Sequence, residues 1–292
     1  RSAMPLRASG FANQVCNTRQ QRIKFYMQQN KENENKNIEL KTTSLERKLK
    51  RLVPPNVKKV LLCFLLNSYV GKALKFCKIR WNLFGGKFDY SLVSDKDAAK
   101  IFWGTWESAE IRFSKRFALT KTIVELGSSV GVTLGVLSNI RSQTKFICVE
   151  AALENFEKLS SLKTLLPTNN EYILLNKAIA YDVDRVTFEF TTTTGSKINE
   201  TGNELGSYVD ATTLSDVLEE NQIEGEYTLI TDIEGAEEAV FYKDEAALKK
   251  CVLIIAELEN TYSHTIDEQI SKLQDIGFNL TERYGSVVVM SR

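Results

Sequence analysis

Short apolar runs alternate with amphipathic stretches along the C-terminal two-thirds of the chain. Runs of strand length occur at residues 122–126, 146–149, 172–175, 227–231 and 252–256. Between them, apolar residues recur at helical spacing, for example at Leu153, Phe156, Leu159 and Leu162. Strands and helices that alternate in this way predict a parallel sheet covered by helices on both faces, which is the α/β class.

Two further segments refine this prediction. Residues 278–282 and 286–290 predict a closing strand pair, with one antiparallel strand at or near the edge of the sheet. Residues 191–210 are polar and contain three glycines, so they predict a long loop. Because loops of that length in compact domains are often functional, we expect this one to face a substrate.

The N-terminal third has a different composition. Residues 1–55 are polar and predict a flexible extension, residues 56–100 predict a helical segment, and residues 101–292 predict the Rossmann-like domain. The apolar run at 60–66 is too short to span a bilayer, so we expect a buried or amphipathic helix and no transmembrane segment. Association with a membrane surface is the alternative. No signal peptide is evident.

Charge and cysteine content narrow the possible partners. The 38 Lys and Arg residues nearly balance the 37 Asp and Glu residues, which leaves a net charge of +1. That balance gives no overall attraction to nucleic acid, so none is expected as a partner. Five cysteines without a CxxC pair, and a single histidine, argue against a zinc site and favour reduced thiols in the cytoplasm. The oligomeric state is not indicated.

A glycine motif follows the first apolar run. Gly127 and Gly131 are separated by three residues that include Ser129, and Glu125 precedes them. A dinucleotide site needs GxGxxG so that a pyrophosphate can approach the backbone, and an acid at position 125 would repel it. Glu150 ends the next run, where a carboxylate can accept hydrogen bonds from ribose hydroxyls. The combination favours a nucleoside with a cationic end, although a tight strand-to-helix turn alone would also explain the glycines.

Further acids follow the fourth and fifth apolar runs. Asp232 and Glu234 come directly after the fourth run, and Glu257 and Glu259 end the fifth. Ligands of open α/β sheets bind outside the carboxyl ends of the strands, so these acids should border one crevice. Glu237 and Glu238 could simply favour the start of a helix.

With these residues in view, the chain resembles the FkbM family of S-adenosylmethionine-dependent methyltransferases. The most specific element is Asp232-Ile233-Glu234-Gly235-Ala236-Glu237, which is similar to the family's D-[VI]-E-G-A-E block. Supporting segments are 124–131, 146–159, 176–180 and 213–218, and the resemblance extends over about 87–290. The family's first motif has Asp, Ala and Asn where this chain has Glu125, Ser128 and Ser129, and its Glu-x-His has Glu259 in place of the histidine. His264 is a possible substitute, although a lone histidine is more often without a role.

The resemblance implies a class I methyltransferase sheet, mostly parallel with one antiparallel strand and preceded by a helical extension. It implies S-adenosylmethionine as cofactor and O-methylation of a glycan or small-metabolite hydroxyl. Gly127–Gly131 with Glu125 would hold the methionine portion and Glu150 the ribose. Ala178 would lie near the adenine, and Asp232 would face the reacting methyl group. Glu234 and Glu257 would orient the acceptor or take its proton.

Three alternatives remain at this stage. The clustered acids could hold a divalent cation through oxygen ligands, although no metal ligand set is expected. The chain could be a non-catalytic module that retains the fold and tethers partners through residues 1–80. An NAD-dependent oxidoreductase is the least favoured, because the GxxxG spacing lacks the dinucleotide pattern.

Overall fold

Seven strands form one sheet in a computed structural model of the protein, which describes residues 65–192, 195–199 and 207–292. Their order across the sheet is β10-β11-β9-β8-β1-β2-β3. The strands are β1 (Thr122–Leu126), β2 (Lys145–Val149), β3 (Glu171–Leu175), β8 (Tyr227–Thr231), β9 (Cys251–Glu257), β10 (Asn279–Tyr284) and β11 (Val287–Ser291).

Strand direction fixes the fold class. β1 pairs in parallel with both β2 and β8, and β2–β3 and β8–β9 are parallel as well. β11 runs antiparallel to both of its neighbours, β9 and β10. This is a doubly wound sheet, because the chain adds β2 and β3 on one side of β1 and then adds β8 and β9 on the other side. The predicted class I methyltransferase sheet, mostly parallel with one antiparallel strand, is therefore confirmed.

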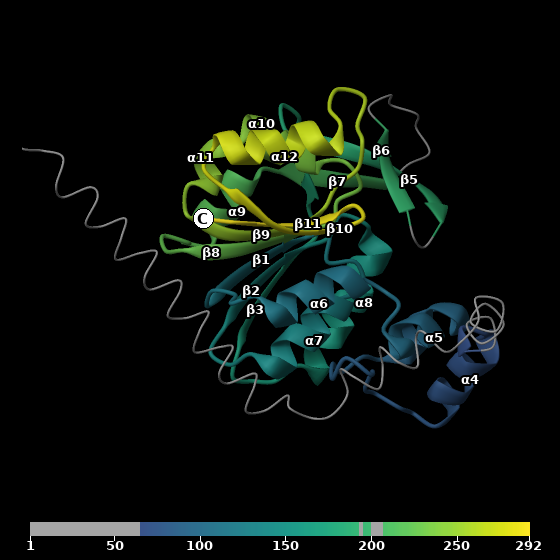
Figure 1. Ribbon diagram of the computed structural model, residues 1–292. Helices are drawn as coiled ribbons and strands as arrows, with labels where there is room; N and C mark the ends of the chain where they lie inside the picture. The colour runs from purple at the N-terminus through teal and green to yellow at the C-terminus, as the bar shows by residue number, and fades with distance from the viewer. Residues whose placement is uncertain (1–64, 193–194, 200–206) are drawn as a thin grey trace, which may run out of the picture. The chain divides into compact units, whose positions relative to one another are not determined.

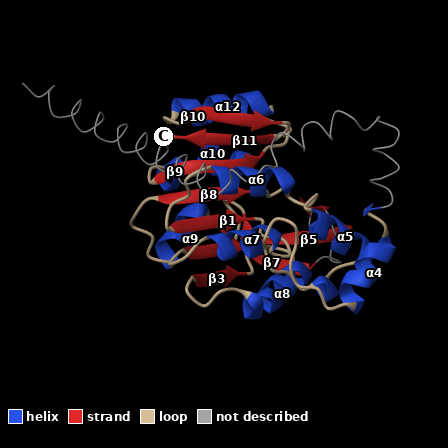
Figure 2. Ribbon diagram, turned by 60° about the horizontal axis from the view of Figure 1, so that its bottom comes forward, coloured by secondary structure: helices blue, strands red, loops and turns tan. Residues whose placement is uncertain are grey.

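Helices cover both faces of the sheet (Figures 1 and 2). One face carries α6, α7 and α8, and the other carries α9, α10, α11 and α12. Their bounds are α6 (Ser108–Arg116), α7 (Val132–Ile140), α8 (Leu153–Leu162), α9 (Leu214–Glu220), α10 (Glu237–Lys243), α11 (Glu245–Leu248) and α12 (Ile266–Asp275). A short 3-10 helix, η2 (Lys163–Leu165), follows α8. Each face has its own apolar core, because neighbouring strand residues point to opposite sides.

A second, smaller sheet corrects one prediction. It has the order β4-β7-β5-β6 and comprises β4 (Ala178–Ile179), β5 (Arg185–Thr192), β6 (Gly195–Asn199) and β7 (Ser207–Thr212). The long loop predicted for 191–210 is therefore wrong over its described residues, where β6 and β7 both pair with β5. Antiparallel strands can be polar on one side, so the polar composition of residues 191–210 did not indicate strands there. The pairing of β6 and β7 with β5 is evident only in the folded protein.

The segment before the sheet packs through close backbone approaches. It contains α4 (Ser68–Phe76), the 3-10 helix η1 (Tyr90–Leu92) and α5 (Asp95–Trp103). A Cβ atom on Gly71 would lie 1.8 Å from the carbonyl oxygen of Asp95, and one on Gly135 of α7 would lie 2.6 Å from that of Lys87. Glycine at these two positions therefore lets α4 approach α5 and lets residue 87 approach α7.

Other predictions about the N-terminal region stay predictions. The extension at 1–55 and most of the apolar run at 60–66 lie outside the described residues. The domain boundaries predicted at 55/56 and 100/101 likewise stay predictions. Within the described part of the chain, no helix has the length and apolar character needed to cross a membrane.

Candidate active site at the carboxyl ends of the strands

The turn after β1 lies against the end of β8. Gly127 has φ +80°, and a Cβ atom there would stand 1.9 Å from the carbonyl oxygen of Asp232. The amide N–H groups of Gly127 and Ser128 both donate to the carbonyl oxygen of Val149, at 2.9 and 3.1 Å. Only glycine combines this backbone conformation with so close an approach. The predicted glycine turn therefore joins the ends of β1, β2 and β8.

The carboxylate of Glu150 holds the same turn from the β2 side. Its Oε2 accepts from the amide of Ser129 at 2.8 Å, and its Oε1 accepts from the amide of Ala152 at 2.8 Å. Ser129 has φ +47°, so this hydrogen bond fixes a backbone conformation that side-chain-bearing residues rarely adopt. Each carboxylate oxygen keeps acceptor capacity for a further donor. Ser129 and Glu150, predicted separately, are thus in direct contact.

Ala178 lies close to the Glu150 segment. The side-chain amide of Asn176 donates to the carbonyl oxygens of Glu150 and Ala151, at 2.9 and 3.0 Å. Ala178 is buried in a small apolar cluster that includes Ala151. The structure therefore brings the predicted adenine-side residue next to the predicted ribose-side residue.

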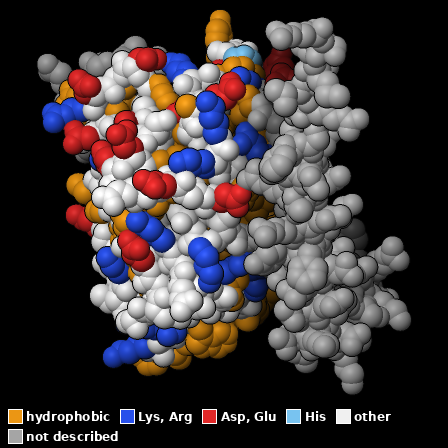
Figure 3. Space-filling model, turned by 90° about the vertical axis from the view of Figure 1, so that its left-hand side faces the viewer, with side chains coloured by type: hydrophobic (Ala, Val, Ile, Leu, Met, Phe, Trp, Pro, Cys, Tyr) orange, Lys and Arg blue, Asp and Glu red, His pale blue; other side chains and the backbone are white. Residues whose placement is uncertain are grey.

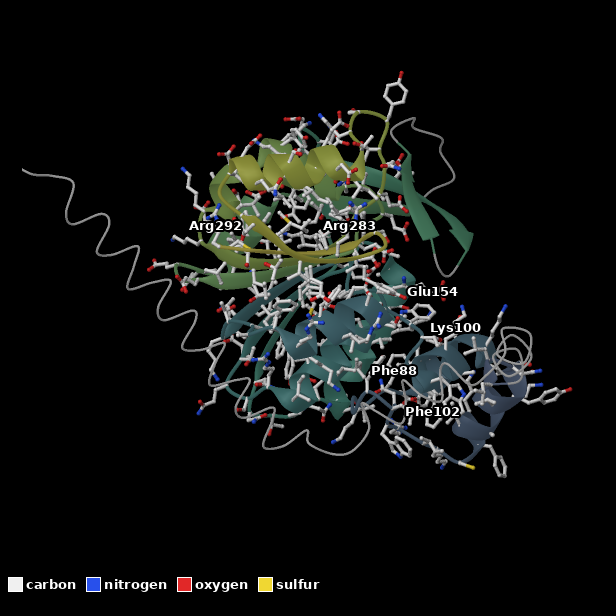
Figure 4. All side chains as sticks on the ribbon, in the orientation of Figure 1. Phe88, Lys100, Phe102, Glu154, Arg283 and Arg292 are labelled. Carbon is white, nitrogen blue, oxygen red and sulfur yellow. The ribbon has the colours of Figure 1, made fainter. Side chains whose placement is uncertain are left out.

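Four strand-end carboxyl groups point to one side of the sheet. Ile123, Cys148, Ile230 and Ile255 belong to the core on the α6–α7 side. Because side chains alternate along a strand, the acids two residues after each of these positions share that side. They are Glu125, Glu150, Asp232 and Glu257. In Figure 4, the labelled residues Glu154, at the start of α8, and Arg283, beside the β10–β11 turn, lie at the end of the sheet where the strands that carry these acids finish.

Helix α6 adds two acids that sequence reasoning missed. Glu110 is buried, and its carboxyl group lies close to that of Glu257. Glu107 accepts from the amide and the hydroxyl of Thr133, at 3.2 and 2.6 Å. A signal was present, because Glu110 occupies a helical stripe otherwise formed by Trp106, Phe113 and Phe117. A carboxyl group on an apolar stripe is an unusual buried charge.

Burial and mutual repulsion raise several pKa values in this crevice. Burial, followed by the charges of Glu257 and Glu107, raises the pKa of Asp232 to about 9. Burial and the charge of Glu107 raise the pKa of Glu125 to about 8. Burial is also the first cause for Glu110, whose pKa rises to about 7. Among the described residues, no ion pair with Lys or Arg involves these carboxyl groups or Glu257. A positive charge placed among these carboxyl groups would favour their ionised forms.

The turn between β8 and α10 is held by Glu237. Its carboxylate accepts from the amides of Ile233 and Gly235, at 2.5 and 2.9 Å, and its side chain is 1% exposed. Burial raises its pKa to about 7. Glu237 thus shapes the turn rather than only favouring the helix start. Glu234 lies exposed on this turn with φ +54°, and its predicted acceptor role stays a prediction.

His264 is more constrained than expected. Its Nδ1 lies 2.7 Å from Glu238 Oε1, its ring stacks on Tyr242 with centroids 4.1 Å apart, and Thr261 donates to the same carboxylate. Glu259, at the place of the family histidine, is exposed beside Gly235. The pair of His264 and Glu238 therefore fastens the loop after β9 to the start of α10.

The two tryptophans before the glycine motif have separate surroundings. Trp106 donates through Nε1 to Glu107 Oε1 at 2.9 Å, and Lys100 Nζ lies 5.4 Å from its ring centroid. Trp103 packs edge-on against Phe102, with centroids 5.1 Å apart. Both contacts are with the protein's own side chains. As for metals, the described residues contain no group of three or more His, Cys, Asp or Glu side chains placed to hold an ion.

The sheet order and the single antiparallel strand β11 define a class I methyltransferase-type α/β fold. Residues 142–280 match the family model described as the methyltransferase FkbM domain. The match confirms the predicted resemblance to the FkbM family over this part of the chain. The match includes Glu150, the Asp232–Glu237 block and Glu257, and begins after the glycine motif.

Similar solved structures share low sequence identity with the chain. Fibrillarin from Aeropyrum pernix, in complex with natively bound S-adenosyl-L-methionine, is 11% identical with a TM-score of 0.37, and the match covers 62% of this chain and 73% of that one. Magnesium protoporphyrin IX methyltransferase from Synechocystis PCC 6803, with bound SAM, is 13% identical with a TM-score of 0.38, covering 76% and 94%. Precorrin-6y C5,15-methyltransferase from Geobacter metallireducens is 10% identical with a TM-score of 0.38, covering 71% and 95%. No curated protein matches the chain.

Proposed function

We propose that this protein is an S-adenosylmethionine-dependent methyltransferase that methylates a hydroxyl oxygen of a glycan or a small metabolite. One observation carries the proposal. Glu125, Glu150, Asp232 and Glu257 lie at the carboxyl ends of neighbouring strands and on one side of the sheet, without a Lys or Arg partner among the described residues. Such a crevice suits a cationic sulfonium nucleoside without phosphates. The FkbM domain match supports the same assignment.

The cofactor half comprises β1, β2 and the turn after β1. Glu150 is placed to accept hydrogen bonds from ribose hydroxyls, because both carboxylate oxygens are already oriented by the amides of Ser129 and Ala152. Glu125 and the Gly127–Gly131 turn border the place of the methionine portion, and Ala178 that of the adenine. A bound S-adenosylmethionine would supply an electrophilic methyl group on a good leaving group. These residues would therefore act by binding and orientation.

The acceptor half comprises the ends of β8 and β9 with α6. Asp232 carries a proton in the cofactor-free protein, because its pKa is raised to about 9, and the positive charge of a bound sulfonium would favour the ionised form that could take a hydroxyl proton. Glu110 and Glu257, which lie close to each other, are the other candidate bases. Ser286 donates to Glu257 Oε1 at 2.8 Å, which orients this carboxyl group. A positioned base of this kind contributes about 10²–10⁴-fold to an alcohol reaction. Glu234, on the exposed turn beyond Asp232, would contact the part of the acceptor nearest solvent.

A calorimetric titration tests the cofactor assignment. Wild-type protein should bind S-adenosylhomocysteine, and Glu150→Ala should bind it at least about tenfold more weakly, because a ribose acceptor is lost. Glu219→Gln, which removes an exposed carboxylate on α9, is the matched control and should bind as the wild type does. Equal binding by Glu150→Ala and wild type would reject the site.

A non-catalytic binding module is the second candidate. The replacement of the family histidine by Glu259 is the observation that favours it. Incubation with labelled S-adenosylmethionine and fractionated glycans or metabolites, followed by mass detection, separates the two. Methyl transfer that Asp232→Asn abolishes supports the enzyme, whereas cofactor binding without transfer to any fraction supports the module.

The charge distribution bears on possible partners as well. Figure 3 shows the face opposite the crevice, where positive and negative side chains are interspersed over its described part. A basic tract of the kind that follows a nucleic-acid backbone is not formed by the described residues of that face.

A further inference from the structure

The N-terminus of α7 is where a doubly wound fold commonly binds phosphate. Helix α7 follows the glycine turn, and its first amides point toward the crevice. Gly131, the residue before the helix, has φ +82° and no side chain to cap those amides. Helix N-termini of this kind bind anions, and dinucleotide-binding proteins place a pyrophosphate there.

In this protein a side chain already occupies that position. The carboxylate of Glu107 accepts from the amide of Thr133, the second residue of α7, at 3.2 Å and from its hydroxyl at 2.6 Å. Trp106 Nε1 donates to the other carboxylate oxygen at 2.9 Å. The anion-binding end of α7 is therefore filled by a carboxylate that comes from the turn before α6.

The backbone at Glu107 is held in an unfavourable conformation. Glu107 has φ +46°, in the left-handed region that residues with a side chain seldom adopt. Its own side chain does not cap α6, although it stands at the N-cap position of that helix. Strained residues of this kind persist where the surrounding structure fixes them, often at functional sites. The conformation places the carboxylate on α7 instead of on α6.

Glu107 lies near the strand-end carboxyl groups, and burial raises its own pKa above the ordinary value. Its charge is one of those that raise the pKa values of Glu110, Glu125, Glu150 and Asp232. Lys100, which lies over the ring of Trp106, pairs with Asp97 instead of Glu107. A phosphate at the N-terminus of α7 would be repelled by the Glu107 carboxylate, whereas in dinucleotide-binding proteins the helix N-terminus is free to bind it.

We propose that Glu107 determines cofactor specificity by occupying the anion-binding end of α7, so that the crevice rejects phosphate-bearing nucleotides and accepts a cationic nucleoside. The inference deepens the proposed function and rests on it for the identity of the accepted cofactor. Glu107 is here a specificity-determining residue and takes no part in proton transfer.

Competition between two adenosine ligands tests this role. S-adenosylhomocysteine and ADP share the adenosine and differ in carrying an amino-acid chain or a diphosphate. Calorimetry on the full chain should show that the wild type binds the first and binds ADP far more weakly. In Glu107→Gln, which keeps the size of the side chain and one acceptor oxygen but removes the charge, the ratio of the two dissociation constants should fall by about tenfold or more.

Further variants make the result decisive. Glu219→Gln removes the same charge from the exposed surface of α9 and should leave the ratio unchanged. Glu107→Ala is a second neutral variant and should shift the ratio in the same direction as Glu107→Gln. Glu107→Asp keeps the charge on a shorter side chain and should retain most of the wild-type preference for S-adenosylhomocysteine over ADP.

The outcomes separate the two proposals. If the wild type binds neither S-adenosylhomocysteine nor S-adenosylmethionine, the proposed cofactor is wrong. If the wild type binds S-adenosylhomocysteine and both folded neutral variants keep its ratio, the role of Glu107 is wrong and the proposed function stands. If neither neutral variant folds, Glu107 is a structural residue and the specificity role is rejected.

Discussion

The two halves of the crevice are built in different ways. In the cofactor half, the turn after β1 is held by backbone amides that donate to Val149 and Glu150. In the acceptor half, carboxyl side chains from β8, β9 and α6 meet one another, as in the contact of Glu110 with Glu257. A backbone-held turn is rigid and depends on glycine, whereas a group of carboxyl side chains is sensitive to protonation. Substitutions in the first half should therefore affect folding and cofactor affinity, and those in the second should affect turnover and pH dependence.

The largest expected effect is on the glycine turn. Gly127→Ala would place a Cβ atom 1.9 Å from the carbonyl oxygen of Asp232 at a φ of +80°. We expect a loss of roughly 3–5 kcal/mol in the free energy of unfolding, since strain and a backbone clash combine. Urea denaturation measures it. Gly225→Ala is the matched control, because nothing lies within 4 Å of that position, and a similar loss there would remove the distinction.

The next effect should appear in turnover. Asp232→Asn keeps the shape of the side chain and removes its capacity to take a proton, so kcat should fall by about 10²–10⁴-fold. Affinity for S-adenosylhomocysteine should change less than it does in Glu150→Ala. Single-turnover assays with the identified acceptor, beside calorimetry, give both quantities. A loss confined to cofactor affinity would place Asp232 in the other half of the crevice.

The acceptor half should also make stability depend on pH. The pKa of Asp232 is raised to about 9 in the folded protein from an ordinary value of 3.8, so the folded form binds the proton more tightly than the unfolded chain. Its contribution to stability is fully present below about pH 4 and is lost as the pH rises toward 9. Thermal melts of the cofactor-free protein from pH 5 to 9 should show a falling Tm. Asp232→Asn should show a shallower fall, and identical slopes would contradict the assignment.

The smallest effect should come from outside both halves. His264→Gln breaks the contact with Glu238 at the surface of the loop after β9. We expect less than about 1 kcal/mol of destabilisation and an unchanged cofactor affinity, because the pair is partly exposed. Chemical denaturation and calorimetry check both. A large loss of turnover with normal affinity would instead show that His264 replaces the family histidine.

Local pattern predicted much of the cofactor half. Two strand ends and one glycine spacing predict the proposed cofactor-binding residues, which are Glu125, Gly127, Ser129, Gly131 and Glu150. The acceptor half was predicted only in part. Asp232 and Glu257 are predicted because they end strands, whereas Glu110 lies on α6, before the sheet, and Glu107 is the N-cap residue of that helix. Their approach to the crevice depends on how α6 packs over the sheet, which no local spacing encodes.

The amino-acid sequence by itself determined the order of strands and helices in the seven-stranded sheet, the closing antiparallel strand and the position of the glycine turn. These features follow from hydrophobic periodicity and from backbone conformations that only certain residues adopt. The tertiary structure decided which acids share a face, that β6 and β7 pair with β5, and that Glu107 fills the end of α7. Such contacts join residues far apart in the chain, and their energy depends on burial and distance, which exist only once the chain has folded.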